Sequence, residues 1–315
     1  MGHSKMKRFG YVLGSTLTVI CSVYFFQYLI RYWHVITEVQ WDLQAWLVAG
    51  LSLILYLIAS LATIAVWWIF LQTAGERISY YSAMRITLLA QFGKYLPGNV
   101  GHHIGRVVLA KKSGMNIPRV MFSIAVETVW AVTVTALLTL ACVLAVGDRW
   151  LIQFSDSIPS VKEMYVIFVV ILLLFGILYW LVRRWNQWKR DACSSANRIN
   201  MPDVSAYMKT MMLIIGNFLI MGFVLYILGM QVFDLNTMDY LLVTAAFVVS
   251  WTIGFVTPGA PAGLGIREIL LVGMLGSLGV ANAVAIAALL RLITVLGDGV
   301  MFVAGLILKK QNYEK

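Results

Sequence analysis

The sequence has few charged residues for its size. Of its 315 residues only 12% are Asp, Glu, Lys or Arg, whereas a soluble domain carries about 25%. Because 61% of the residues are hydrophobic, too little polar surface remains to cover a water-facing protein. The composition excludes a free cytosolic enzyme or a DNA-binding factor and indicates a polytopic membrane protein.

Residues that build metal sites, disulfide frameworks and nucleotide sites are also scarce. The cysteines Cys21, Cys142 and Cys193 form no CxxC pair, and the histidines form no HExxH motif. The sequence also has no Walker loop, dinucleotide fingerprint, Ser-His-Asp order or paired carboxylates. We therefore expect no metal, no cofactor and no enzyme activity, and no ATP-driven pump formed by this chain alone.

Six apolar runs are long enough to cross about 30 Å of hydrocarbon. They cover residues 11–30, 43–73, 117–146, 161–182, 208–230 and 281–308. The first run is longer than the apolar core of a signal peptide, and no small-x-small cleavage site precedes Arg31. Two further apolar segments, 80–113 and 240–278, are interrupted by Gly and Pro. The sequence therefore predicts an all-α protein with about six full spans and two broken segments.

The distribution of basic residues orients these spans. If the N-terminus lies inside and each broken segment returns to its own side, only Arg31, Arg149 and Lys162 lie outside, and most other cations lie inside. This asymmetry predicts a multi-pass protein of the inner or plasma membrane with both termini in the cytoplasm. The cations are spread over several short loops, so we expect no nucleic-acid partner.

An internal repeat divides the chain. At an offset of 161 residues the pattern G-x3-P-G-x7-R, from Gly93 to Arg106, occurs again from Gly254 to Arg267. We predict an N-terminal span and outer segment (1–42), a first half (43–182) containing segment 80–113, an inside basic linker (183–207), and a second half (208–315) containing segment 240–278. The oligomeric state is not predicted.

The Pro-Gly pair in each copy of the pattern breaks a helix. Proline has no N–H and disfavours helix in the residue before it, and the glycine after it permits positive φ. Each broken segment is thus predicted to be a re-entrant hairpin whose unwound tip faces protein or a water-filled cavity. The two hairpins would enter from opposite faces, which is the inverted-repeat plan of secondary transporters. The alternative is a pair of ordinary spans with proline kinks.

Ionisable side chains cluster at these breaks. Such residues are rare in apolar segments and usually mark a functional path, and cations beside helix N-termini suit a phosphate or another anionic headgroup. The predicted substrate-binding residues are Lys94, Pro97, Gly98, His102, His103, Arg106, Glu127, Pro258, Gly259, Arg267, Glu268 and Arg291.

Several of these residues have a structural interpretation as well. Arg106 and Arg267 recur at matched repeat positions, which favours a role in the site, but each could instead form a salt bridge or cap hairpin carbonyls. Lys94 could extend to the membrane interface. Of His102 and His103 we expect at most one to face the cavity, because a buried neutral histidine commonly bonds a backbone carbonyl.

Three charged residues outside the hairpins carry further alternatives. Glu127 and Arg291 could pair with each other as a buried structural ion pair. Asp298, which lies between two glycines, could mark a flexible point or a coupling-ion ligand. We do not include Asp298 among the predicted substrate-binding residues.

Two motifs resemble a known family. They are GKYLPGNVGHHIGRVVLAKKSG, followed by a span with a glutamate, and PGAPAGLGIREILLVGMLGSLG, followed by ALLRL. Over roughly residues 43–308 they resemble the flippase-like transmembrane domain of lysylphosphatidylglycerol synthases, whose stand-alone members are often associated with glycolipid or cell-envelope pathways. The resemblance implies lipid translocation without the aminoacyl transfer of the missing soluble domain. An arginine often follows the glutamate in that family, and Thr128 stands there in this chain.

The resulting hypothesis is a lipid flippase. It would move an anionic lipid, either a polyprenyl-phosphate-linked sugar or a modified phospholipid, between leaflets, with glycosyltransferases as candidate partners. The alternative is an integral-membrane glycosyl- or phosphotransferase, or its subunit, with Glu127, Glu268, His102 or His103 as catalytic group. A third hypothesis, an ion-coupled exporter of small solutes, predicts a small aqueous site closed to lipid.

Overall fold

The structure is a computed structural model that describes residues 41–95, 100–151, 199–257 and 263–309, together with Val23, Gln27, residues 30–31, 33–37 and Val39. Within these residues every regular element is a helix and no strand occurs, which confirms the all-α fold. The predicted spans 11–30 and 161–182 and the basic linker lie largely outside the described residues. The helix-breaking residues Pro97, Gly98, Pro258 and Gly259 also lie outside them.

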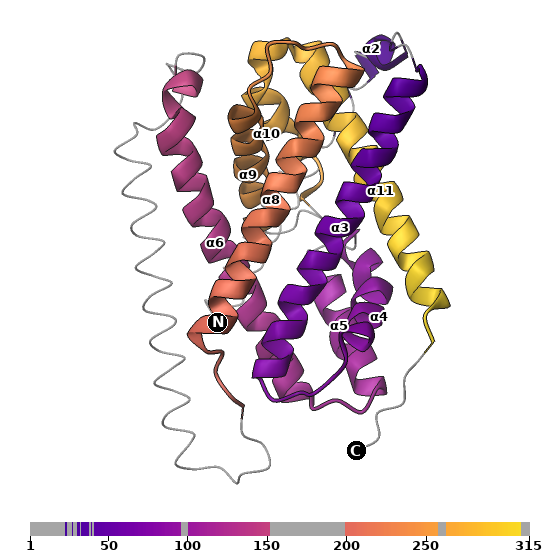
Figure 1. Cartoon of the computed structure of the whole chain (residues 1–315), viewed down its shortest axis with the longest axis vertical. Coiled ribbons are helices and arrows are strands. Elements are labelled where there is room, and N and C mark those ends of the chain that lie inside the picture. Colours follow the sequence, from indigo (N-terminus) through magenta and orange to yellow (C-terminus); the bar gives the residue numbers. More distant parts are fainter. Residues whose placement is uncertain are drawn as a thin grey trace, which may run out of the picture.

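Four long helices form the frame of the molecule (Figure 1). They are α3 (Leu43–Thr73), α6 (Ile117–Leu151), α8 (Val204–Val232) and α11 (Val280–Ile307). Each is apolar and long enough to cross a membrane, so the spans predicted at 43–73, 117–146, 208–230 and 281–308 are confirmed. The helix α8 begins at Val204 rather than at 208, because the Asp203 carboxylate accepts a hydrogen bond from the Ala206 N–H at 2.9 Å and caps it.

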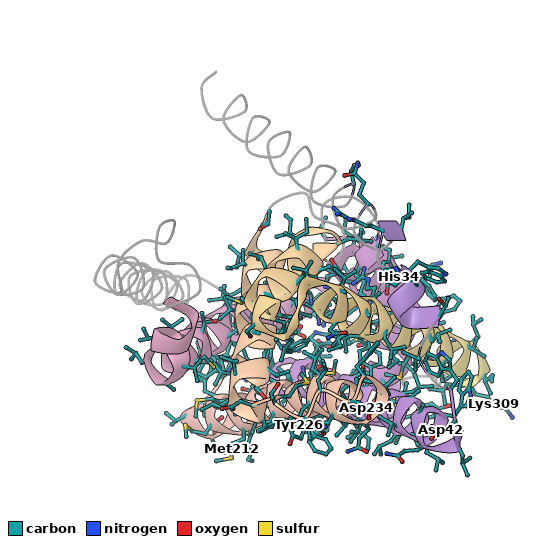
Figure 2. All side chains as sticks on the ribbon, turned by 90° about the horizontal axis from the view of Figure 1, so that it is seen from above. His34, Asp42, Met212, Tyr226, Asp234 and Lys309 are labelled. Atoms are coloured by element: carbon teal, nitrogen blue, oxygen red, sulfur yellow. The ribbon has the colours of Figure 1, made fainter. Side chains whose placement is uncertain are left out.

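The outer faces of these helices are apolar. Large hydrophobic side chains such as Leu47 and Ile54 of α3, Met212 of α8 and Leu306 of α11 are exposed. In Figure 2, which looks down the bundle, side chains dominated by carbon radiate from its perimeter, with Met212 at the edge. Such a surface is unusual for a soluble monomer and is the surface that lipid tails cover. The protein is therefore a multi-pass membrane protein.

Both broken segments are hairpins that turn back within the bundle. In the first, α4 (Tyr80–Ala90) continues into the 3-10 helix η1 (Gln91–Tyr95), and α5 (Gly101–Lys112) packs back against α4. In the second, α9 (Tyr240–Val256) packs against α10 (Ile266–Met274), which η4 (Gly276–Leu278) follows. The two hairpins occupy opposite ends of the bundle (Figure 1). The alternative of two kinked ordinary spans is therefore wrong.

A glycine at the same repeat position lets the two legs of each hairpin approach closely. A Cβ on Gly93 would lie 2.5 Å from the backbone carbon of Gly101, and a Cβ on Gly254 would lie 3.2 Å from the Cβ of Arg267. The first distance is far below van der Waals contact, and the second is only slightly tight. The first glycine of the repeated pattern therefore has a packing role in both copies, stricter in the first hairpin.

The main hydrophobic core lies between the second hairpin and the long helices. It includes Phe218, Leu225 and Leu228 of α8, Phe247 of α9 and Ile286 of α11, all of them buried. The helix α3 packs against α8, α6 and α11, and the short helix α2 (Trp33–Thr37) contacts α11. This packing fixes α11 between the two hairpins, so its polar residues Arg291 and Asp298 are held inside the protein.

Candidate functional site

A cavity of about 280 Å³ lies between the two hairpins and the long helices. Its wall takes residues from α3, α4, η1, α5, α6, α8, α9, α10 and α11, so both hairpins contribute to it. The charged residues in the wall are Lys94, Arg106, Glu127, Arg267, Arg291 and Asp298, which give four cations and two carboxylates. A space of this size is near the lower end of small-molecule sites and accommodates a headgroup rather than a whole lipid.

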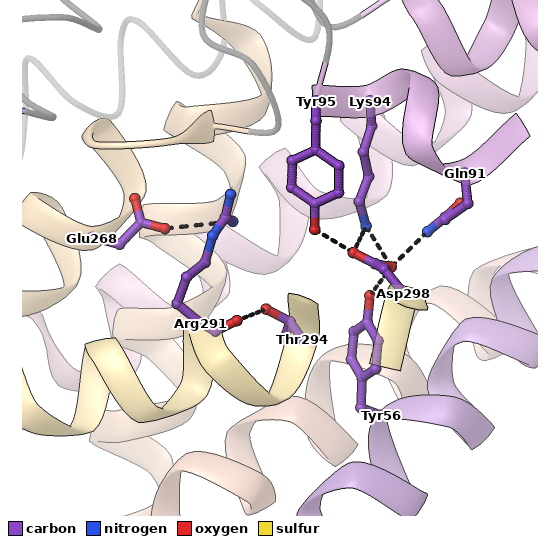
Figure 3. A network of polar contacts seen from close by, with 8 residues as sticks. All are labelled: Tyr56, Gln91, Lys94, Tyr95, Glu268, Arg291, Thr294 and Asp298. Carbon is purple, nitrogen blue, oxygen red and sulfur yellow. Dashed lines mark hydrogen bonds and ion pairs between the residues drawn. The ribbon is translucent and has the colours of Figure 1, made fainter. Parts of the chain in front are cut away.

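Asp298 of α11 is the centre of the densest polar network (Figure 3). Lys94 Nζ lies 2.8 Å from Oδ1 and 2.7 Å from Oδ2 of this carboxylate, and therefore binds both oxygens. The hydroxyl of Tyr56 donates to Oδ1 at 2.7 Å, that of Tyr95 to Oδ2 at 2.5 Å, and the Gln91 amide to Oδ1 at 3.2 Å. The network joins α3, η1 and α11. Among the described residues, Lys94 is the only cation that contacts the Asp298 carboxylate.

Gly297, beside Asp298, makes room for this network. Gly297 packs so closely against the Tyr56 ring that a Cβ there would overlap it. Small residues let membrane helices approach in this way. The alternative that Lys94 extends to the membrane interface is wrong, because Lys94 points inward to a carboxylate 204 residues away.

Arg106 of α5 is held by three groups at once. One guanidinium nitrogen donates to Glu127 Oε2 of α6 at 2.7 Å, and the other donates to His103 Nδ1 at 2.8 Å. The guanidinium also lies 4.9 Å from the Trp67 ring of α3, a cation–π distance. Since arginine can only donate, His103 Nδ1 accepts and the ring carries its proton on Nε2. Arg106 is 4% exposed, so it is a buried, neutralised arginine.

Arg291 of α11 has a partner on the second hairpin. Its Nη1 lies 3.5 Å from Glu268 Oε1 (Figure 3). The other oxygen of Glu268 accepts from the Gly265 N–H at 2.7 Å and so caps the start of α10. The alternative in which Glu127 and Arg291 pair with each other is therefore wrong, because each of them has a different partner. The N-terminus of α10 is also partly occupied by the Glu268 carboxylate, which leaves fewer free N–H groups for an anion than the sequence predicts.

Arg267 of α10 differs from the other three cations. Its guanidinium lies 4.7 Å from the Phe247 ring and forms no hydrogen bond or ion pair within the part of the chain that the structure describes. It is only partly buried and lines the cavity. Neither structural alternative for Arg267, a salt bridge or a carbonyl cap, is present among the described residues.

The two histidine rings pack against each other in a tilted arrangement at the cavity wall. Their ring centroids are 3.8 Å apart, and both residues line the cavity, so the prediction that at most one faces it is wrong. His103 accepts from Arg106, whereas His102 Nδ1 is buried and has no hydrogen-bond partner among the described residues. A buried nitrogen without a partner is costly, which makes His102 available to a bound molecule.

Of the predicted site residues, the structure brings Lys94, His102, His103, Arg106, Glu127, Arg267 and Arg291 to the cavity wall, and Glu268 lies behind Arg291. Whether these residues bind substrate stays a prediction. The sequence did not place Tyr56, Gln91, Tyr95, Trp251 and Asp298 in the site, although all of them line the cavity. The Gly-Asp-Gly run inside an apolar span was the one available signal for Asp298.

Comparison with known proteins decides the family. Residues 11–300 match the family described as the lysylphosphatidylglycerol synthase TM region. The chain belongs to this family. This membrane-domain family is associated with lipid-modifying synthases, and the resemblance drawn from the two Pro-Gly motifs is confirmed. No curated protein matches the chain.

The chemistry that this arrangement offers is the binding of an anion. Within the described residues both carboxylates of the cavity wall are already ion-paired, and no group of three or more metal-ligating side chains occurs there. The absence of a metal and of a cofactor stays a prediction. The cavity provides an excess of cations in an apolar surrounding, and such a site stabilises an anion.

Proposed function

We propose that this protein moves the anionic headgroup of a lipid between the two leaflets of the membrane. The observation that carries the proposal is Arg267, a guanidinium in the cavity that contacts no described carboxylate. An unpaired charge in a low-dielectric environment is costly, and a phosphate oxygen pair would match the planar fork of arginine. Either a polyprenyl-phosphate-linked sugar or a modified phospholipid would supply that phosphate.

The other cations support the same proposal. Lys94, Arg291 and Arg267 are near enough for their charges to interact. The cavity wall carries two more cations than carboxylates, so an anion of one or two charges would neutralise it. Without such partners the removal of a phosphate from water would be prohibitive. The cations therefore lower the barrier for the headgroup to cross. The lipid tail stays in the surrounding membrane, and a lateral opening connects the cavity to it.

The arrangement of the hairpins supports a transporter mechanism. Two hairpins that carry the same pattern enter from opposite ends of the bundle and meet at the cavity (Figure 1). We propose that they are inverted repeats and that rocking of one repeat against the other opens the cavity to each leaflet in turn.

The proposed orientation places both termini in the cytoplasm of a cell or inner membrane. The end of the bundle where α3 and α11 end carries Arg77, Lys111, Lys112, Arg119, Lys209 and Lys309 with the carboxylates Glu76 and Asp203, whereas the opposite end carries Asp42, Asp234 and Asp239 with Arg31. This asymmetry agrees with the positive-inside rule. Glycosyltransferases are the proposed partners if the substrate is a lipid-linked saccharide.

Reconstitution tests this function. Purified protein would be placed in liposomes of neutral lipid that contain a trace of a labelled lipid with a phosphate headgroup. A membrane-impermeant reagent then reports how fast the label leaves the inner leaflet. We expect transport well above protein-free liposomes, and no acceleration for a labelled neutral lipid. Equal rates with and without protein, over a panel of polyprenyl-phosphate and phospholipid probes, would contradict the proposal.

A membrane glycosyl- or phosphotransferase is the alternative. Its candidate catalytic groups are Glu127, Glu268, His102 and His103, of which only His102 has a buried nitrogen without a partner. Both glutamates are already bound to arginines, which favours a structural role for them. Product analysis after incubation with lipid-linked sugars separates the two functions, because a flippase leaves the lipid chemically unchanged.

A further inference from the structure

Asp298 is a buried carboxylate whose only directly bound cation is one that an anionic headgroup would also need. Its side chain is 1% exposed, and Lys94 bridges both of its oxygens. Lys94 lines the same cavity as Arg267. In the described structure, Asp298 therefore occupies the position on Lys94 that a phosphate would take.

An anion that binds Lys94 separates this cation from the Asp298 carboxylate. The carboxylate would keep its hydrogen bonds from Tyr56, Tyr95 and Gln91 but lose its counter-ion, and an uncompensated charge in a protein interior costs several kcal/mol. A proton removes that cost. A protonated carboxyl donates one hydrogen bond, and the tyrosine hydroxyls and the Gln91 amide oxygen can accept it.

We infer that Asp298 takes up one proton from solvent when an anionic headgroup binds Lys94, so that headgroup binding and protonation are coupled. The inference rests on the proposed function. The step adds one proton to the carboxylate oxygen and changes no other covalent bond. When Asp298 is protonated, the ion pair between η1 and α11 is lost and only the neutral hydrogen bonds with Tyr95 and Gln91 join them, which loosens the first hairpin from α11.

The other charged groups near Asp298 are cations or are already bound to a partner, so Asp298 is the group that takes up the proton. Arg267 and Arg291 are the next cations, and Arg291 is already paired with Glu268 of α10. On α4, which also packs against α11, Arg85 is bound to the Leu308 carbonyl at the far end of α11. On α2, His34 lies at the end of the bundle where α11 begins.

A proton fits this site better than a metal cation. Both Asp298 oxygens already accept hydrogen bonds from N–H or O–H donors, including the Lys94 ammonium. A sodium ion would need several oxygen ligands with free lone pairs, whereas here four neighbours present donors to the carboxylate. The described residues also contain no acidic cluster that could share such an ion.

The coupling is measured as protons taken up per bound lipid. The probe is dihexanoyl phosphatidylglycerol, a phosphodiester whose single charge is constant through the neutral pH range, added to the full chain in neutral-lipid nanodiscs. Titration calorimetry in two buffers of different ionisation enthalpy gives the proton count. The expected result is about one proton per bound lipid, with an affinity that rises about tenfold for each unit by which the pH falls.

Variants assign the proton to Asp298. Asp298→Asn should bind without proton uptake, while Asp203→Asn, an exposed helix-capping control, should behave as the wild type. An infrared difference spectrum of the wild type should gain the band of a protonated carboxyl upon binding. Tyr56→Phe should shift this band, which makes the assignment independent of whether Asp298→Asn folds.

Each outcome decides one of the two proposals. Binding by the wild type without proton uptake overturns the coupling and leaves the flippase proposal intact. Unchanged uptake in Asp298→Asn, or an unshifted carboxyl band in Tyr56→Phe, also overturns the assignment to Asp298. If neither this lipid nor any other anionic probe binds the wild type, the proposed function fails, and the coupling fails with it.

Discussion

Arg106 and Arg267 occupy the same position of a repeated pattern, yet their surroundings are opposite. Arg106 is 4% exposed, binds Glu127 at 2.7 Å and His103 at 2.8 Å, and is neutralised. Arg267 lies over the Phe247 ring and contacts no described carboxylate. The repeat therefore sets where an arginine stands in a hairpin, and the neighbouring helices decide whether its charge is used for stability or remains available to a ligand.

The same contrast extends to the carboxylates. The first hairpin is tied to the long helices by two ion pairs, Lys94 with Asp298 and Arg106 with Glu127. The second hairpin has Glu268, which binds Arg291 but also caps its own helix. We therefore expect substitution of Arg106 to affect mainly stability, and substitution of Arg267 to affect mainly anion binding.

The largest predicted effect is on stability. Arg106→Ala leaves Glu127 as a buried charge without a partner, which should cost about 3–5 kcal/mol and lower the thermal unfolding temperature in detergent sharply. Arg267→Ala, its match in the other hairpin, should cost less than about 1 kcal/mol because no ion pair is lost. The double variant Arg106→Ala with Glu127→Ala should regain part of the loss. Equal destabilisation by Arg106→Ala and Arg267→Ala would contradict the proposed difference between the two arginines.

The repeated glycines sharpen the comparison at the level of packing. Gly93→Ala places a Cβ 2.5 Å from the Gly101 backbone and should cost about 1–3 kcal/mol, because one leg of the hairpin must shift. Gly254→Ala meets only the Arg267 Cβ at 3.2 Å and should be nearly neutral, since alanine also favours the helix by about 0.5–1 kcal/mol. Thermal unfolding of both variants checks this order.

Anion binding should depend more on Arg267 than on Arg106, which is the reverse of the order expected for stability. Arg267→Ala removes a charged hydrogen-bond donor from the cavity and should weaken binding of a short-chain phosphate lipid about 30-fold, or about 2 kcal/mol. Arg267→Lys keeps the positive charge but not the planar guanidinium, and should recover part of the lost affinity. Calorimetric titration of the folded variants, with a zwitterionic lipid as control, gives the affinities. A wild-type affinity in Arg267→Ala would show that Arg267 is not the binding group.

The smallest predicted effect concerns Glu268. Glu268→Gln keeps a side-chain acceptor for the Gly265 N–H but removes the charge that pairs with Arg291. We expect a stability loss of about 1 kcal/mol and an anion affinity a few-fold higher, because Arg291 becomes available. An affinity that falls instead would assign Glu268 a direct role in the site.

The spans and hairpins could be predicted because they follow from local sequence. A run as apolar as Leu43–Thr73 must be a helix in a membrane, and it begins and ends as predicted. The two hairpins were predicted from the Pro-Gly pair in each broken segment, a combination that disfavours a continuous helix. The start of α8 was missed because the Asp203 cap extends the helix beyond its apolar run.

The partners inside the cavity could not be predicted in this way. Lys94 and Asp298 are 204 residues apart, and no periodicity links them. The correct partner of Glu127 is Arg106, which the sequence placed in the site for its repeat position alone. Sequence identified charges that must be buried, but only the packing of α6 and α11 against the hairpins selects which charges meet.

The most direct test of the central claim is transport of a labelled phosphate-headgroup lipid in liposomes that contain equal amounts of folded wild type or Arg267→Ala. Protein-free liposomes and a neutral-lipid label serve as controls. The account predicts that the wild type moves the anionic label well above the protein-free rate, and that Arg267→Ala, although equally folded, loses at least about nine-tenths of this activity. Full transport by Arg267→Ala would contradict it.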